Sequence, residues 1–144
     1  MLEGGNVNII DIRTDEVDFT RAKRNVEDTL TSYPDIDGLV GLWSYNTPQI
    51  VEAVRAAGKV GEVKVIGFDE DPVTLRGIAD GIVEATVVQQ PYEFGYQSMM
   101  NMAKVLEGDT SFIPEDELMI IPTRVIDASN VDEFRKEMQQ LLSN

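Results

Sequence analysis

Short apolar runs alternate with helix-patterned segments along this chain of 144 residues. The runs predict strands at residues 7–12, 38–43, 63–68, 83–88 and 118–126, the last of which Pro122 interrupts. Each run is followed by a segment whose apolar residues recur every three or four positions, as on one face of a helix. Strands that alternate with helices in this way pair mainly in parallel. The sequence therefore predicts an α/β fold in three layers, with a mainly parallel open sheet and helices on both faces.

The predicted helices begin at residues that favour helix N-termini. These starts are Thr14 or Asp15, Thr47, the acidic segment 69–71, Pro91, and Ser129 or Asn130. The helix that begins at Pro91 is predicted to carry Phe94, Met102 and Leu106 and to end at Gly108. No internal boundary divides the chain, so residues 1–144 are expected to form one domain.

Composition excludes several classes of function. The chain has 12 basic and 26 acidic residues, and its net charge of −14 disfavours nucleic acid and anionic membrane surfaces as partners. It contains neither cysteine nor histidine, which removes thiol nucleophiles, imidazole bases and Cys/His zinc sites. No stretch reaches the roughly 18 apolar residues that span a bilayer. Residues 1–8 lack the pattern of a signal peptide, so no export signal is expected in this chain.

Polar residues follow three of the predicted strands, at residues 43–46, 69–71 and 89–90. The carboxyl ends of parallel strands meet at one edge of a sheet, and ligands of open α/β sheets bind beyond that edge. These three segments are therefore expected to form one site.

The side chains at this edge suit a neutral polyol. Asp69 can accept hydrogen bonds from two hydroxyls at once, and the amides of Gln89 and Asn46 can both donate and accept. Trp43 or Tyr45 offers an aromatic face for a sugar ring. The sequence predicts a sugar site with Asp69 as its main acceptor.

Other interpretations of the same residues stay open. Asp69 precedes a helix and could serve only as its N-cap, while the run Asp69, Glu70 and Asp71 could hold a metal ion. A small α/β enzyme that uses these carboxylates is a further alternative. The sequence contains no Gly-x-Ser-x-Gly elbow or phosphate loop, and we predict no catalytic residues, no metal and no cofactor.

Two longer motifs resemble a known family. After Gly58-Lys59, the segments VKVIGFDEDP (residues 63–72) and GIADGIVEATVVQQPYEFGYQS (residues 77–98) are similar to the C-terminal lobe of type I periplasmic sugar-binding proteins. The ribose-binding proteins of ABC transporters are the type members, and LacI-type repressors contain the same lobe. The resemblance extends over nearly the whole chain.

The resemblance implies specific sugar contacts. It assigns Asp69 and Gln89 to hydrogen bonds with sugar hydroxyls. A third contact is expected at the start of the preceding helix, where counting back from Gly58 indicates Trp43 or Ser44 and side-chain chemistry favours Asn46. The implied function is capture of a monosaccharide or similar polyol, outside the cytoplasm, for the membrane permease of an ABC importer.

The resemblance also implies that part of the protein lies outside this chain. Residues 1–144 are expected to represent one lobe, without the N-terminal lobe and without the first strand and helix of this lobe. We therefore expect weak or no sugar affinity for the chain alone, and a homodimer that covers its exposed edge and tail. The effector domain of a LacI-type regulator remains the main alternative function.

Overall fold

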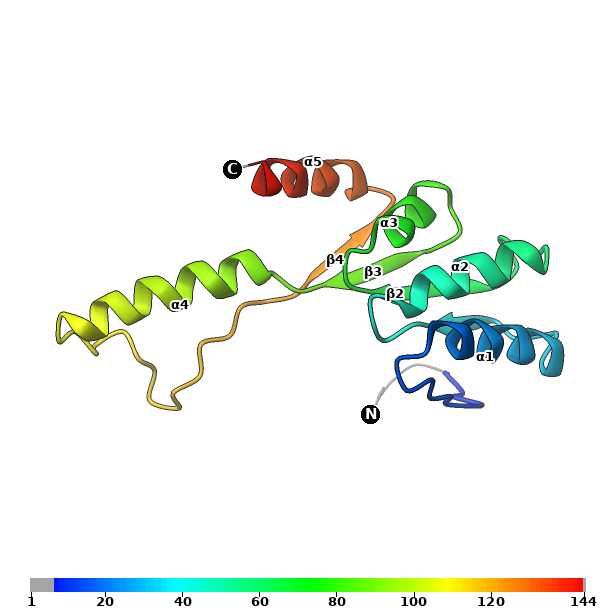
Figure 1. Cartoon of the computed structure of the whole chain (residues 1–144), viewed down its shortest axis with the longest axis horizontal. Helices are drawn as coiled ribbons and strands as arrows, with labels where there is room; N and C mark the ends of the chain where they lie inside the picture. The colour runs from blue at the N-terminus through cyan, green and yellow to red at the C-terminus, as the bar shows by residue number, and fades with distance from the viewer. Residues whose placement is uncertain (1–6, 144) are drawn as a thin grey trace.

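The computed structural model describes residues 7–143, which form one four-stranded sheet with five helices. Its strands, adjacent in chain order, are β1 (Gly38–Val40), β2 (Lys64–Phe68), β3 (Ala85–Val88) and β4 (Arg124–Asp127). β1 pairs with β2 and β2 with β3 in parallel, whereas β4 runs antiparallel to β3 (Figure 1). The α/β class and the mainly parallel open sheet predicted from the sequence are confirmed.

Four of the helices lie side by side along the sheet (Figure 1). The five helices are α1 (Phe19–Ser32), α2 (Asn46–Ala56), α3 (Pro72–Ala79), α4 (Pro91–Leu106) and α5 (Val131–Leu142). Helices α1, α2, α3 and α5 contact one another in that order, and α2, α3 and α5 each contact a strand. The sheet residues beneath them are buried, including Val65, Val88 and Ile126, while the residues between, such as Ile66 and Val87, stay partly exposed.

The core lies between α2 and the sheet. Ile50, Val51 and Val54 of α2 pack with Val65 of β2 and with residues of α3 and α5. Burying each of these side chains contributes roughly 1.5–3 kcal/mol. Residues 50, 51 and 54 follow helical spacing, so the apolar face predicted for this helix is the face that is buried.

Gly67 allows α2 to approach the end of β2 closely. A Cβ atom at Gly67 would lie 2.8 Å from Thr47 Oγ1 and 3.2 Å from Thr86 Oγ1. Thr47 is fully buried in the first turn of α2. The missing side chain at Gly67 thus brings the start of α2 beside the carboxyl ends of β2 and β3.

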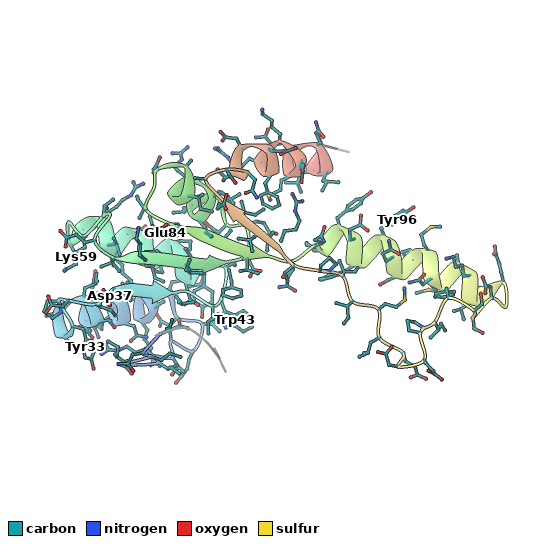
Figure 2. The ribbon with its side chains drawn as sticks, turned by 180° about the vertical axis from the view of Figure 1, so that it is seen from behind. Tyr33, Asp37, Trp43, Lys59, Glu84 and Tyr96 are labelled. Carbon is teal, nitrogen blue, oxygen red and sulfur yellow. The ribbon has the colours of Figure 1, made fainter. Side chains whose placement is uncertain are left out.

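Helix α4 projects away from the sheet, and the segment 107–123 returns along it (Figure 1). No residue of α4 is buried, and its apolar residues Phe94, Met102 and Leu106 are exposed. The outgoing and returning segments meet at a neck, where Gln90 Nε2 donates to the carbonyl oxygen of Pro122 at 2.8 Å. Figure 2 shows Tyr96 on this projecting helix.

Three predicted strands differ clearly from the structure, and one of them, predicted at residues 38–43, ends at Val40. Residues 7–12 form no strand and are exposed, because the described sheet provides no neighbour with which they pair. The last strand begins only at Arg124, since Pro122 has no amide hydrogen to donate to a ladder. The first helix also begins later than predicted, with Asp18 as its cap.

Among residues 7–143, no helix has the length and apolar character needed to cross a membrane.

Candidate functional site

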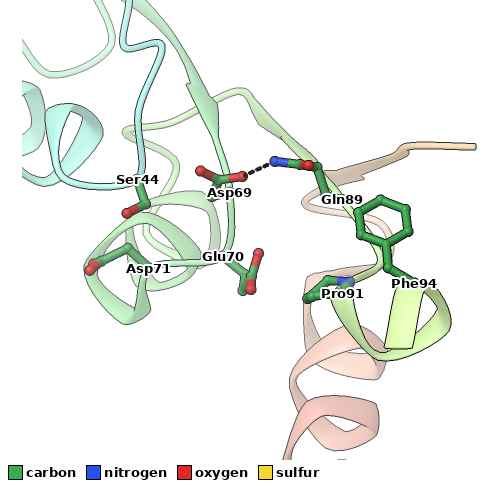
Figure 3. A pocket seen from close by; sticks show the side chains of 7 residues that line it. All are labelled: Ser44, Asp69, Glu70, Asp71, Gln89, Pro91 and Phe94. Atoms are coloured by element: carbon green, nitrogen blue, oxygen red, sulfur yellow. Dashed lines mark hydrogen bonds between the residues drawn. The ribbon is translucent and has the colours of Figure 1, made fainter. Parts of the chain in front are cut away.

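A pocket of about 420 Å³ lies where β2, β3 and the loop between β1 and α2 end (Figure 3). Its lining residues are Ser44, Asp69, Glu70, Asp71, Gln89, Pro91 and Phe94. They come from all three segments that the sequence places at this edge. The first turn of α4 completes the lining, so the pocket lies beside the neck.

The backbone of Asp69 is held in an unusual conformation. Its φ is +65°, in the left-handed region that Asp and Asn tolerate better than most residues. The Asp69 amide donates to the carbonyl oxygen of Val87 at 2.9 Å, and Thr86 Oγ1 donates to the Asp69 carbonyl oxygen at 2.8 Å. Two contacts to β3 therefore hold the backbone of Asp69 in place at the strand end.

The carboxylate of Asp69 faces Gln89 across the ends of two adjacent strands. Gln89 Nε2 donates to Asp69 Oδ1 at 3.4 Å, a long bond that a ligand hydroxyl can replace (Figure 3). Asp69 is not the cap of α3, because Asp71 Oδ1 accepts the amide of Val73 at 2.7 Å instead. The helix-cap interpretation thus belongs to Asp71.

Glu70 carries the perturbed carboxyl group of the pocket. Burial raises the pKa of Glu70 above its ordinary value, and the negative charge of Asp69 raises it further. Glu70 consequently takes up a proton at higher pH than an exposed glutamate does. Figure 3 shows the side chains of Asp69, Glu70 and Asp71 pointing in different directions. Within residues 7–143, no group of three or more acidic side chains is arranged to hold a metal ion.

Four predicted contacts, Trp43 to Asn46, lie where the loop after β1 enters α2, but their surroundings differ. Ser44 lines the pocket, whereas Trp43 is 67% exposed and does not. Tyr45 Oη and Asn46 Nδ2 both donate to the carboxylate of Asp15. Of the six predicted contacts, the structure brings Asp69, Gln89 and Ser44 together in the pocket.

Sequence reasoning missed two apolar members of the site, Pro91 and Phe94. Both lie in the first turn of α4 and border the pocket next to Gln89 (Figure 3). The available signal was the spacing: Phe94 follows Gln89 by five residues, and a helix that begins at Pro91 turns it back toward the strand end. Phe94 offers an apolar surface against which the carbon face of a sugar ring can pack.

Comparisons with known proteins agree on one family. Residues 1–110 match the family described as the periplasmic binding protein domain. The ribose import binding protein of Salmonella typhimurium is 28% identical over 102 residues, which cover 71% of this chain and 34% of that protein. The D-ribose/D-allose-binding protein of Pseudomonas aeruginosa is 24% identical over 127 residues, or 88% of this chain and 40% of that protein.

A solved structure shows the same likeness in three dimensions. An ABC transporter solute binding protein from Agrobacterium vitis, with bound allitol, matches with a TM-score of 0.74 and 28% identity. The match covers 90% of this chain and 45% of that one. The chain spans about a third of the length of the ribose import binding protein that it resembles.

Proposed function

Because the chain belongs to the periplasmic binding protein domain family, we propose that it forms one wall of a sugar-binding site in a solute-binding protein of an ABC importer. The ligand is a monosaccharide or similar polyol. Asp69, Gln89 and Ser44 hydrogen-bond its hydroxyls, and Phe94 packs against its carbon face. The protein works outside the cytoplasm and delivers the sugar to a membrane permease.

The pairing of Asp69 with Gln89 is the observation that carries this proposal. A carboxylate and a primary amide 3.4 Å apart provide acceptors and donors for the hydroxyls of one small ligand. Asp69 is held by two contacts to β3 and is not used as a cap, so its carboxylate oxygens can bind a ligand. The pocket of about 420 Å³ has the size of small-molecule sites in general.

The relatives favour an importer over the two alternatives. The proteins from Salmonella and Pseudomonas are named for binding sugars, and the first of them for ribose import, rather than for regulation. Family members are binding proteins rather than enzymes. The groups of this site can act by binding alone, because they are held in place to recognise hydroxyls.

The proposal is tested by nuclear magnetic resonance titration of the isotope-labelled chain with D-ribose, D-allose and allitol. The pocket leaves much of a ligand in water, so we expect dissociation constants in the millimolar range, which correspond to a binding free energy of about −4 kcal/mol. Shifts should concentrate on the Gln89 side-chain amide and the backbone amides of Ser44 and Asp69. If no sugar in this panel shifts these signals at tens of millimolar, the proposed function is wrong.

Self-association is a second expected property, because α4 is apolar and carries no net charge. Its only charged residues are Glu93 and Lys104, in a chain of net charge −14. Tyr92, Met99 and Leu106 are exposed along it, and depletion of charge with enrichment of Tyr and Met is typical of protein interfaces. We therefore expect a dimer in which the α4 helices of two copies pack together.

Sedimentation velocity at micromolar concentration measures whether the chain forms this dimer. The chain should sediment as a dimer, and Met99→Lys should return it to a monomer because the change places a charge in the interface. Val73→Lys, at an exposed position of α3, is the matched control and should leave the dimer intact. A monomer for the unchanged chain would contradict the expectation.

A further inference from the structure

Asp15 reaches the pocket loop from a segment 30 residues away in sequence. Its carboxylate accepts three hydrogen bonds: from Tyr45 Oη, from Asn46 Nδ2 at 2.6 Å and from the backbone amide of Val17 at 2.9 Å. Asp15 is half-buried and does not line the pocket. Its carboxylate therefore acts on the loop rather than on the space that a ligand would fill.

The side chain of Asn46 connects Asp15 to the loop of residues 43–46. Its side-chain Oδ1 accepts a hydrogen bond from the backbone amide of Trp43 at 3.1 Å. The backbone amide of Asn46 donates to the Trp43 carbonyl oxygen at 2.9 Å. The Asn46 side chain is thus oriented at both ends, with Nδ2 on Asp15 and Oδ1 on Trp43. Ser44 lies between these two residues, so its position depends on the same set of bonds.

The two residues that follow Asp15 have unusual backbone conformations. Glu16 and Val17 have φ values of +54° and +65°, and a β-branched residue rarely adopts this region. The bond from Val17 N to Asp15 Oδ1 closes the turn that contains them. Backbone outliers of this kind persist where surrounding contacts determine them, and they are common at functional sites.

The charge of Asp15 is held by neutral donors. Burial raises its pKa, but the hydrogen bonds from Tyr45, Val17 and Asn46 outweigh burial, so the pKa of Asp15 lies below its ordinary value. No ion pair of Asp15 occurs among the described residues. Phe19 packs on the same loop, with its ring centroid 4.9 Å from that of Tyr45.

We propose that Asp15 is a positioning residue for the binding site: through Tyr45 and Asn46 it fixes the loop of residues 43–46 so that Ser44 lines the pocket. This inference rests on the proposed function for its consequence, ligand affinity. The loop-holding role itself is observable without any ligand.

Trp43 is the chain's one tryptophan and reports on this loop directly (Figure 2). In Asp15→Ala, the steady-state fluorescence anisotropy of Trp43 should fall because the loop is released. Affinity for D-ribose should weaken about tenfold, the effect of losing roughly one hydrogen bond at the site. Asp11→Ala is the matched control: Asp11 lies in the same segment but pairs with Arg13, and both readouts should stay unchanged.

A reciprocal exchange separates a specific contact from general loss of structure. Asp15→Asn alone places two amide groups against each other and should lower the anisotropy. Combined with Asn46→Asp, the donor and acceptor are swapped, and the anisotropy and ribose affinity should recover. An unchanged Trp43 signal in Asp15→Ala, or no recovery in the swap, overturns the inference. If Trp43 responds as expected but the unchanged chain binds no sugar, the proposed function fails while the loop-holding role stands.

Discussion

Asp69→Asn is expected to weaken sugar binding about a hundredfold, which removes measurable binding from this chain. A carboxylate that accepts two ligand hydroxyls contributes two charge-assisted hydrogen bonds, each worth about 1.5–3 kcal/mol. Asn replaces one acceptor oxygen with a donor and removes the charge. It also tolerates φ = +65°, so the change tests chemistry rather than backbone strain.

Asp71→Asn is the matched control for this experiment. It removes one negative charge from the same pocket, and Asn caps a helix as well as Asp does, so α3 should stay intact. Titration with D-ribose should show binding retained in Asp71→Asn and lost in Asp69→Asn. Equal affinities for Asp69→Asn and the unchanged chain would remove Asp69 from the site.

The sequence predicted the central part of the site because strand ends and residue chemistry are both local properties. Asp69 directly follows the apolar run 63–68, and Gln89 directly follows 83–88. Parallel pairing of β2 and β3 then places them side by side. The distinction between Asp69 and Asp71 as helix cap was not predictable, since either carboxylate suits a helix start and only the backbone geometry decides.

The loop 43–46 shows where sequence reasoning stops. Tyr45 and Asn46 have suitable side chains for a sugar, and nothing local indicates that both turn toward Asp15. That contact joins segments about 30 residues apart, and a pairing of this range depends on how α1 packs against α2. Side-chain chemistry identified the right loop, but tertiary packing selected Ser44 within it.

Helix α4 shows a second limit of reasoning from sequence patterns. Helical spacing of Phe94, Met102 and Leu106 correctly predicted a helix, but periodicity shows only that one face is apolar, not what covers it. The neck at Gln90 and Pro122 turns the whole helix away from the sheet. An apolar stripe is therefore evidence for a partner surface, which need not belong to the same 144 residues.

Ile126→Ala is expected to lower the free energy of unfolding by about 2–5 kcal/mol, the range for truncating a buried Leu, Ile or Met to Ala. Ile126 is 0% exposed and lies in β4 opposite Thr86 of β3. Its neighbours in the core come from both α5 and the parallel strands. Domains are stable by only about 5–15 kcal/mol, so this single change removes a large part of the total.

Urea unfolding followed by circular dichroism measures this effect, with Val125→Ala as the control in the same strand. Val125 is 58% exposed, and its truncation should change the free energy of unfolding by about 0.5 kcal/mol or less. Because β4 follows the neck, a large effect at Ile126 in one cooperative transition means that β4 and α5 fold as part of the sheet that carries Asp69. Equal effects at the two positions would mean that β4 is not packed into the core.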